Sequence, residues 1–202
     1  MIVPMPRWDP RAKERLREAA LELYLEHGYE NVTVAEITER AGLTRRTFSR
    51  YFTDKRDVLF AGSEQLPVAL ADAVLHADAA LAPFEALLTA LADIGDVLAG
   101  RFPHAAQRRA VISASPELLE RERTKFAAVA DAVASALRQR GEDPPRATLF
   151  ADVGVAIFQA AFERWTEHPR DADFSARVRE AATELAAGLT AAGIPGRVPL
   201  SR

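Results

Sequence analysis

Residues 28–55 read GYENVTVAEITERAGLTRRTFSRYFTDK, and this stretch decides the fold of the N-terminal part of the chain. Thr33 and Glu36 have the spacing of a capping box, which predicts a helix that starts directly after Thr33 and stops at Gly42. Thr44 has the position of an N-cap for the next helix, so only a tight turn that contains glycine separates the two helices. Two short helices joined in this way form a helix-turn-helix.

The second helix of this motif has two different faces. Phe48 and Phe52 lie one turn apart and are expected to pack on the preceding helices, which leaves polar and basic side chains on the other face. A guanidinium group bonds to guanine O6 and N7 together or to a phosphate, and arginines at a helix N-terminus oppose the helix dipole, which indicates an anionic partner. The alternative is that these arginines form an ordinary solvated face. The residues predicted to contact double-stranded DNA are Thr33, Thr44, Arg45, Arg46, Thr47, Ser49, Arg50, Tyr51 and Lys55.

Two of these residues lie outside the second helix of the motif. Thr33 stands at the start of the first helix, and Lys55 follows Asp54, the expected N-cap of a further helix. Helix N-termini attract phosphate, so both side chains are predicted to contact the DNA backbone.

The charge of the chain is distributed unevenly. Its 202 residues hold 26 Lys and Arg against 29 Asp and Glu, a formal net charge of -3 that does not by itself indicate a nucleic-acid partner. Residues 40–56, named here the basic stretch, carry six basic side chains against Asp54 alone. We interpret this local excess as charge that faces DNA within an acidic protein.

The composition indicates two modules and an all-α fold of about nine helices. Residues 1–50 hold five alanines and residues 51–202 hold thirty-five, and the patterns that would predict hairpins are missing. A helix over 10–27, capped by Asp9-Pro10 and ended by Gly28, precedes the motif. The predicted domains are a three-helix helix-turn-helix domain at 1–54, a larger helical domain at 55–193 and a flexible tail at 194–202.

Proline or glycine marks the joins between the helices of the larger domain. The expected elements are a helix from Lys55 that Pro67 kinks or interrupts, one from Pro83 to Gly100, a short one after Pro103, a long one from Pro116 to Gly141, one over 147–167 and one from Asp173 to near Gly193.

The helix over 147–167 is apolar nearly all round. From Leu149 to Phe162 only Asp152 and Gln159 are polar, so the helix is expected to be buried, either centrally or between subunits. Asp152 and Gln159 are seven residues apart and share one face. They either orient a polar group of a ligand or, as we favour, make hydrogen bonds at an interface or a rim.

Residues 11–60, and the stretch 28–55 most of all, resemble the DNA-binding domain of the TetR family of bacterial regulators. The resemblance implies a homodimeric repressor that binds a palindromic operator, whose C-terminal domain binds a small-molecule inducer and dimerises through the last two helices. It implies phosphate contacts from Thr33, Thr47, Tyr51 and Lys55 and base contacts from Arg45 and Arg46. Two positions depart from the family pattern, because Arg46 replaces a frequent glycine and Ser49 a usual aromatic residue.

The segment 108–121, together with Thr47-Phe48 and Arg50 to Phe52, resembles the TetR subgroup with an acyl-CoA-like ligand domain. This resemblance implies a small hydrophobic effector of acyl or polyketide type. For each aromatic residue of the larger domain, ordinary core packing is the alternative to ligand contact. The residues predicted to line an effector pocket are Phe84, Leu88, Leu91, Phe126, Phe150, Asp152, Phe158, Gln159 and Phe162.

Motifs of catalysis are missing from the sequence. Its four histidines stand singly, cysteine is absent, and no metalloprotease, nucleophile-elbow or phosphate-loop motif occurs. We therefore expect a protein that is not an enzyme and that needs no cofactor or metal. The alternatives are an all-α enzyme whose site is spread over distant helices and a helix-turn-helix used for protein contacts. Without a signal peptide or a long apolar segment, a cytoplasmic protein with no membrane partner is expected.

Overall fold

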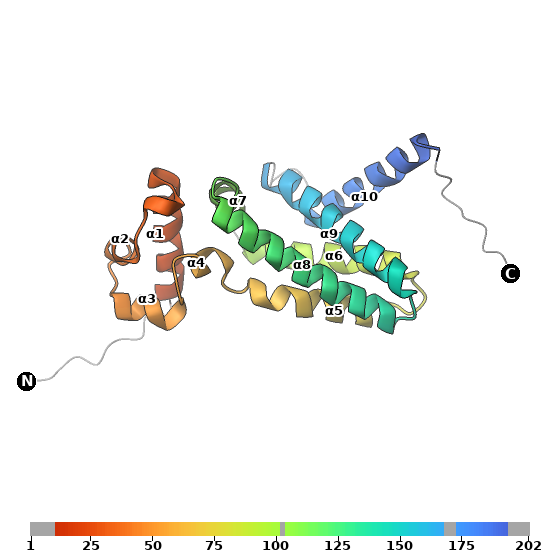
Figure 1. Ribbon diagram of the computed structural model, residues 1–202, viewed down its shortest axis with the longest axis horizontal. Helices are drawn as coiled ribbons and strands as arrows, with labels where there is room; N and C mark the ends of the chain where they lie inside the picture. The colour runs from red at the N-terminus through yellow and green to blue at the C-terminus, as the bar shows by residue number, and fades with distance from the viewer. Residues whose placement is uncertain (1–10, 102–103, 168–172, 194–202) are drawn as a thin grey trace, which may run out of the picture. The chain divides into compact units, whose positions relative to one another are not determined.

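The computed structural model describes residues 11–101, 104–167 and 173–193, and in this part of the chain it contains helices and no strand (Figure 1). The predicted all-α fold class is confirmed. Ten α-helices and two 3-10 helices follow one another within these residues: α1 Ala12–His27, η1 Tyr29–Asn31, α2 Val34–Arg40, α3 Arg45–Tyr51, α4 Asp57–Phe60, η2 Ser63–Gln65, α5 Leu66–His76, α6 Pro83–Arg101, α7 Ala105–Ser113, α8 Pro116–Gln139, α9 Pro144–Glu167 and α10 Phe174–Ala191.

The helix expected from Lys55 is broken into α4, η2 and α5. This break explains why the described residues contain ten α-helices where about nine helices were expected. Ala61 leaves the helical conformation with ψ of 125°, and Gly62 has φ of 92°, where a glycine is favoured. Pro67 was expected to cause the interruption, and this was wrong. It lies in the first turn of α5, where its missing N–H removes no helical hydrogen bond.

Two compact units make up the chain. The first contains the residues up to Glu64 together with Ala106–Arg123, and the second contains Gln65–Ala105 and the residues from Thr124 onward. The sequence had placed the boundary between residues 54 and 55. The difference arises because the apolar residues of α4 share one core with residues of α7 and the start of α8, namely Val58, Leu59, Phe60, Val111, Ile112 and Leu118. The predicted tail at 194–202 lies outside the described residues.

Polar contacts reinforce this core between α4 and the α7–α8 segment. Arg108 Nε donates to the carbonyl oxygen of Leu59 at 2.6 Å, and Arg121 donates to the carboxylate of Asp57 at 2.7 Å. The guanidinium groups of both arginines lie over the ring of Phe60, at 5.3 and 5.2 Å from its centroid. Burial lowers the pKa of Arg108 from its ordinary value. This segment is therefore part of the first unit although it is distant in sequence.

The helix-turn-helix forms as its capping residues predict. Thr33 accepts from the backbone N–H of Glu36, and the Glu36 carboxylate accepts from the N–H of Thr33 at 2.7 Å, which completes the capping box. Thr44 accepts from the N–H of Thr47 at 3.1 Å. Gly42 closes the turn with φ of 62°. The helix before the motif begins at Ala12, and its expected cap Asp9-Pro10 lies outside the described residues.

The second unit is a bundle of α5, α6, α9, α10 and the C-terminal part of α8, with one apolar core. Its helices approach closely where glycine leaves room. A Cβ atom on Gly95 of α6 would lie 2.0 Å from the ring of Phe174 on α10, and one on Gly154 of α9 would lie 2.7 Å from Leu87 on α6. Among the described residues, no helix is long and apolar enough to cross a membrane.

Candidate nucleic-acid interface

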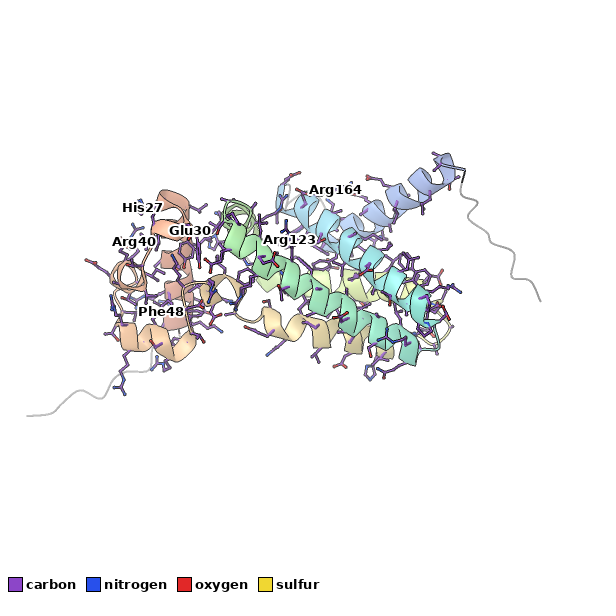
Figure 2. The ribbon with its side chains drawn as sticks, viewed as in Figure 1. His27, Glu30, Arg40, Phe48, Arg123 and Arg164 are labelled. Atoms are coloured by element: carbon purple, nitrogen blue, oxygen red, sulfur yellow. The ribbon has the colours of Figure 1, made fainter. Side chains whose placement is uncertain are left out.

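The core of the first unit fixes which face of α3 meets solvent. Phe48 and Phe52 are buried, and their ring centroids lie 5.4 Å apart (Figure 2 labels Phe48). Burying these two rings turns the opposite side of the short helix outward. The side chains of Arg45, Arg46, Ser49 and Arg50 are exposed there.

The first two arginines of α3 have no partner in the part of the chain that the structure describes. Within the described residues, the guanidinium groups of Arg45 and Arg46 make no hydrogen bond, ion pair or ring contact. An unpaired, exposed guanidinium keeps all its donors for a ligand. Both groups are therefore available to a phosphate or to the edge of a base.

The remaining polar residues of α3 interact with one another. Arg50 Nη2 donates to the hydroxyl oxygen of Tyr51 at 2.9 Å, and its guanidinium lies 4.7 Å from the centre of that ring. The Tyr51 hydroxyl keeps its own proton for another acceptor. The hydroxyl groups of Thr44 and Thr47 lie 3.0 Å apart at the start of the helix. The structure thus brings Arg50 to Tyr51 and Thr44 to Thr47, two pairs among the predicted DNA contacts.

Other members of the basic stretch are paired with acidic side chains. Arg40 on α2 makes a bidentate hydrogen bond to Glu26, at 3.0 and 2.8 Å, and a longer one to Glu22 (Figure 2 labels Arg40). The hydrogen bond that Arg40 donates to Glu26 raises the pKa of Arg40. Arg56 donates from Nε and Nη2 to one carboxylate oxygen of Asp54, at 3.0 and 2.5 Å, and from Nη1 to Glu117 of α8 at 3.0 Å. These two arginines hold elements of the first unit together, and their charges are largely neutralised where they lie.

The two predicted phosphate contacts outside α3 also have internal partners. The Thr33 hydroxyl donates to Glu36 at 2.6 Å, and the Lys55 ammonium donates to three backbone carbonyls. Phosphate contact by Thr33 and Lys55 stays a prediction. Of the six basic residues in the basic stretch, three are paired with carboxylates or carbonyls and three, all on α3, face solvent.

The acidic partners of Arg40 were missed in the sequence. Glu22 and Glu26 are four residues apart, so they lie on one side of α1. Two carboxylates one turn apart on α1, near its expected contact with α2, could have predicted that a cation of α2 pairs with them. The net charge of +5 in the basic stretch therefore overstated the charge that can reach DNA.

The predicted effector-pocket residues belong to the second unit. Leu91 and Phe158 are buried in its core, and Phe84, Leu88, Phe126, Phe150 and Phe162 pack against it half-buried. Phe84 and Phe150 form a pair with ring centroids 5.0 Å apart, and the other three rings make a connected series, with centroid distances of 6.3 Å for Phe126–Phe158 and 6.5 Å for Phe158–Phe162.

Two of the predicted pocket residues are not brought to this aromatic series. Asp152 and Gln159 are exposed on the outer face of α9. Two aromatic residues that the sequence reasoning missed do join the series, because the Phe174 ring lies 5.1 Å from Phe158 and 6.2 Å from Trp165. Phe174 is the first residue of α10 and directly follows Asp173, the expected N-cap. An aromatic side chain at this position was the signal in the sequence that could have predicted its packing against the other rings.

Metal binding has no support in the described part of the chain, where no three acidic or histidine side chains gather into a possible metal site.

Two models of protein families match the chain. Residues 16–61 match the bacterial regulatory proteins of the tetR family, and residues 81–190, more than half of the chain, match the MftR C-terminal domain. The chain belongs to the TetR family. This TetR-family regulator is 25% identical over 155 residues to a Mycobacterium tuberculosis protein named mycofactocin biosynthesis transcriptional regulator MftR, which covers 74% of this chain and 77% of that protein.

Solved structures share the fold of this TetR-family chain. The complex of SmeT, from Stenotrophomonas maltophilia, with triclosan has a TM-score of 0.61 at 19% identity and covers 95% of this chain and 98% of that chain. FadR of Bacillus subtilis in complex with stearoyl-CoA has a TM-score of 0.60 at 19% identity and covers 87% of this chain and 98% of that chain. The resemblance of residues 11–60 to the TetR family is confirmed, and the protein is a DNA-binding transcriptional regulator.

Proposed function

We propose that this protein is a dimeric repressor that binds a palindromic operator through α3 and leaves it when a hydrophobic effector binds the second unit. The observation that carries the proposal is the pair of exposed arginines, Arg45 and Arg46, which have no partner among the described residues and lie on a helix whose other face is core. Two unpaired cations next to a capped helix start are suited to the major groove.

Base reading is assigned to these two residues, and backbone contact to their neighbours on α3. An arginine fork matches the O6 and N7 atoms of guanine, so a G·C pair is expected in each half-site. Tyr51, whose hydroxyl accepts from Arg50, is suited to donate its proton to a phosphate oxygen. In a dimer the two α3 helices would enter major grooves ~34 Å apart, or a multiple of that distance.

Exposed apolar side chains on α9 and α10 support the homodimer. Leu149 of α9 is 57% exposed, and Leu185 and Leu189 of α10 are 39% and 45% exposed. Every residue of α10 from Thr183 on is exposed, and these turns extend past the other helices of the unit (Figure 1). A second copy of the same surface would cover them in an isologous four-helix interface.

The exposed face of α9 also accounts for its two polar residues. Asp152 and Gln159 lie at helical spacing with Leu149 and Ala156, which are exposed as well. This helix was expected to be buried, and in the single chain one of its faces is open. An interface between subunits would bury that face and give Asp152 and Gln159 hydrogen-bond partners.

The effector is proposed to be a small apolar molecule, with an acyl chain as the leading candidate. Its site would lie among the predicted pocket residues of the second unit that are only half-buried, which are Phe84, Leu88, Phe126, Phe150 and Phe162. SmeT and FadR, which share this fold, are seen with triclosan and stearoyl-CoA. We place the action of the protein in the cytoplasm, where it meets DNA.

Binding to the DNA that flanks its own gene tests the proposal. Fluorescence anisotropy should show tight binding whose affinity falls steeply with salt, and a random duplex of equal length should bind ~10³-fold or more weakly. Equal affinity for the two duplexes would remove the operator-specific function. Native mass spectrometry of protein purified from its own host should show a co-purified apolar ligand, and recovery of a strongly polar ligand would contradict the effector class.

A further inference from the structure

We propose that Lys55 is a positioning residue that holds the loop before α2 against the turn after α3, and that its ammonium does not contact DNA phosphate. The inference rests on the proposed function, because it concerns how the helix-turn-helix keeps the geometry that reads DNA. It assigns to Lys55 a role different from the phosphate contact that the sequence suggested.

The ammonium group of Lys55 has all its donors in use. Its Nζ atom lies 2.8 Å from the carbonyl oxygen of Tyr29, 3.2 Å from that of Glu30 and 3.0 Å from that of Val32. An ammonium has three N–H donors and no acceptor, so three carbonyls satisfy it fully. The same atom lies 4.3 Å from the centre of the Tyr29 ring, which adds a cation–π interaction.

The backbone of Lys55 is held as well. The hydroxyl of Tyr24 on α1 donates to the Lys55 carbonyl oxygen at 2.7 Å. The rings of Tyr24 and Tyr29 meet edge to face, with centroids 5.3 Å apart, and both are buried. Lys55 is thus tied through its main chain to α1 and through its side chain to the loop that follows α1.

These contacts link the two ends of the helix-turn-helix. Val32 stands directly before Thr33, the N-cap of α2, and Lys55 follows Tyr51, the last residue of α3. The hydrogen bond between Lys55 and Val32 therefore joins the two ends of the segment that contains both helices. This bond limits the movement of α2 against α3, and hence the movement of the arginines on α3.

Contact with phosphate would break this arrangement. Turning the ammonium outward would remove the shared donor from three carbonyls, whose lone pairs would then need other partners. Arg46 differs from Lys55 in this respect, since within the described residues its guanidinium has no partner to lose. The two residues therefore make a matched pair for an experiment, one held inside the unit and one free.

The experiment compares full-length Lys55→Met, Lys55→Arg and Arg46→Met with the unchanged protein. The dependence of affinity on salt is measured with a random-sequence duplex, well below the unfolding midpoint, because non-specific binding reports phosphate contacts. Affinity for the DNA flanking its own gene, the thermal midpoint and hydrogen exchange at residues 29–34 are measured as well.

Lys55→Met should leave the salt slope unchanged. It should lower the thermal midpoint and speed hydrogen exchange at residues 29–34. Specific binding by the folded protein should weaken by about tenfold, which is the size of one lost base contact. Arg46→Met removes an exposed cation that meets phosphates on random DNA, so it should lower the slope there by about 0.9 per subunit and leave exchange unchanged, while its loss of affinity should be larger on the flanking DNA, where Arg46 is proposed to read a base. Lys55→Arg keeps the positive charge and so tests whether the hydrogen bonds of the ammonium, rather than its charge, hold residues 29–34. A planar guanidinium cannot satisfy three converging carbonyls, so exchange should again be faster.

The opposite pattern would overturn the inference. If Lys55→Met lowers the slope by about 0.9 per subunit with unchanged exchange, Lys55 contacts phosphate. Normal specific affinity in folded Lys55→Arg and Lys55→Met, despite a lower midpoint, would mean that the residue only stabilises the unit. If the unchanged protein binds no DNA, the proposed function fails, and the exchange data still show whether Lys55 holds residues 29–34.

Discussion

At the scale of single residues, the surroundings of each basic side chain decide its role. Arg40 and Arg56 lie within hydrogen-bonding distance of carboxylates, whereas Arg45 and Arg46 have none nearby in the described part of the chain. A carboxylate partner neutralises the charge and fixes the side chain. Only the arginines without such a partner have an uncompensated charge and a side chain that can move to contact DNA.

Arg46 is the residue whose loss should change sequence preference. Arg46→Ala is expected to cost ~1–3 kcal/mol of specific binding energy and to relax preference at one base position, because it removes a contact to a base edge. Arg40→Ala serves as the control and should leave that preference intact. Competition with operator duplexes changed at single positions measures both. Equal losses on specific and random DNA would take Arg46 out of the base-reading residues.

The pairing of Arg40 with Glu26 predicts a dependence of stability on pH. The hydrogen bond from Arg40 lowers the pKa of Glu26 below its ordinary 4.5, and His27 Nε2 lies 3.5 Å from the same carboxylate. A depressed folded-state pKa stabilises the protein above the unfolded value, and this contribution is lost as pH falls through the folded value. Glu26→Gln should therefore be less stable than the unchanged protein at about pH 5.5, and the difference should shrink by about pH 2.5. A difference that stays constant in urea unfolding across this range would contradict the pairing.

At the scale of elements, close helix contacts depend on single glycines. On α6, Gly95 faces Phe174 of α10 so closely that the ring occupies the space of a Cβ atom. Such a contact makes the helix pair intolerant of added volume, since neither the ring nor the backbone of α6 can move without disturbing the aromatic series.

Gly95→Ala is expected to destabilise the protein by ~1–3 kcal/mol, although alanine favours helix, because the methyl group overlaps the Phe174 ring. Urea unfolding measures the loss. In the double variant Gly95→Ala, Phe174→Leu the smaller side chain should relieve the overlap, so the two changes should cost less together than the sum of each alone. Strictly additive losses would show that the ring and the methyl group do not meet.

At the scale of the whole molecule, the proposed binding to a palindromic operator needs two copies, because one α3 would contact one half-site. Leu185→Glu should place a charge in the proposed α9–α10 interface and convert the dimer to monomers at micromolar concentration, with loss of operator binding. Val68→Glu is the matched control, since Val68 is 62% exposed on α5, away from these helices in sequence. Analytical ultracentrifugation reports the association state. A dimer that persists in Leu185→Glu would move the interface elsewhere.

The local elements were predictable because their causes are local. Thr33, Glu36 and Thr44 satisfy backbone groups within three residues of themselves, so the capping box and the helix starts follow from the sequence alone. Phe48 and Phe52 were predicted to be buried from their spacing. The break before α5 was misplaced because a proline is compatible with a first helical turn, and because Gly62, where the helix is broken, was not considered as its cause.

By itself the sequence determined the all-α fold, the helix-turn-helix and the family, since capping, helical periodicity and a motif on one helix depend on neighbours in the chain. Only the tertiary structure decided which basic residues are free, because the partners of Arg40 and Lys55 lie 14 to 26 residues away and arrive by folding. It also decided that residues 106–123 join the first unit and that Asp152 and Gln159 face outward. Contacts between distant segments follow from packing, and packing is set by the whole core rather than by any one stretch of sequence.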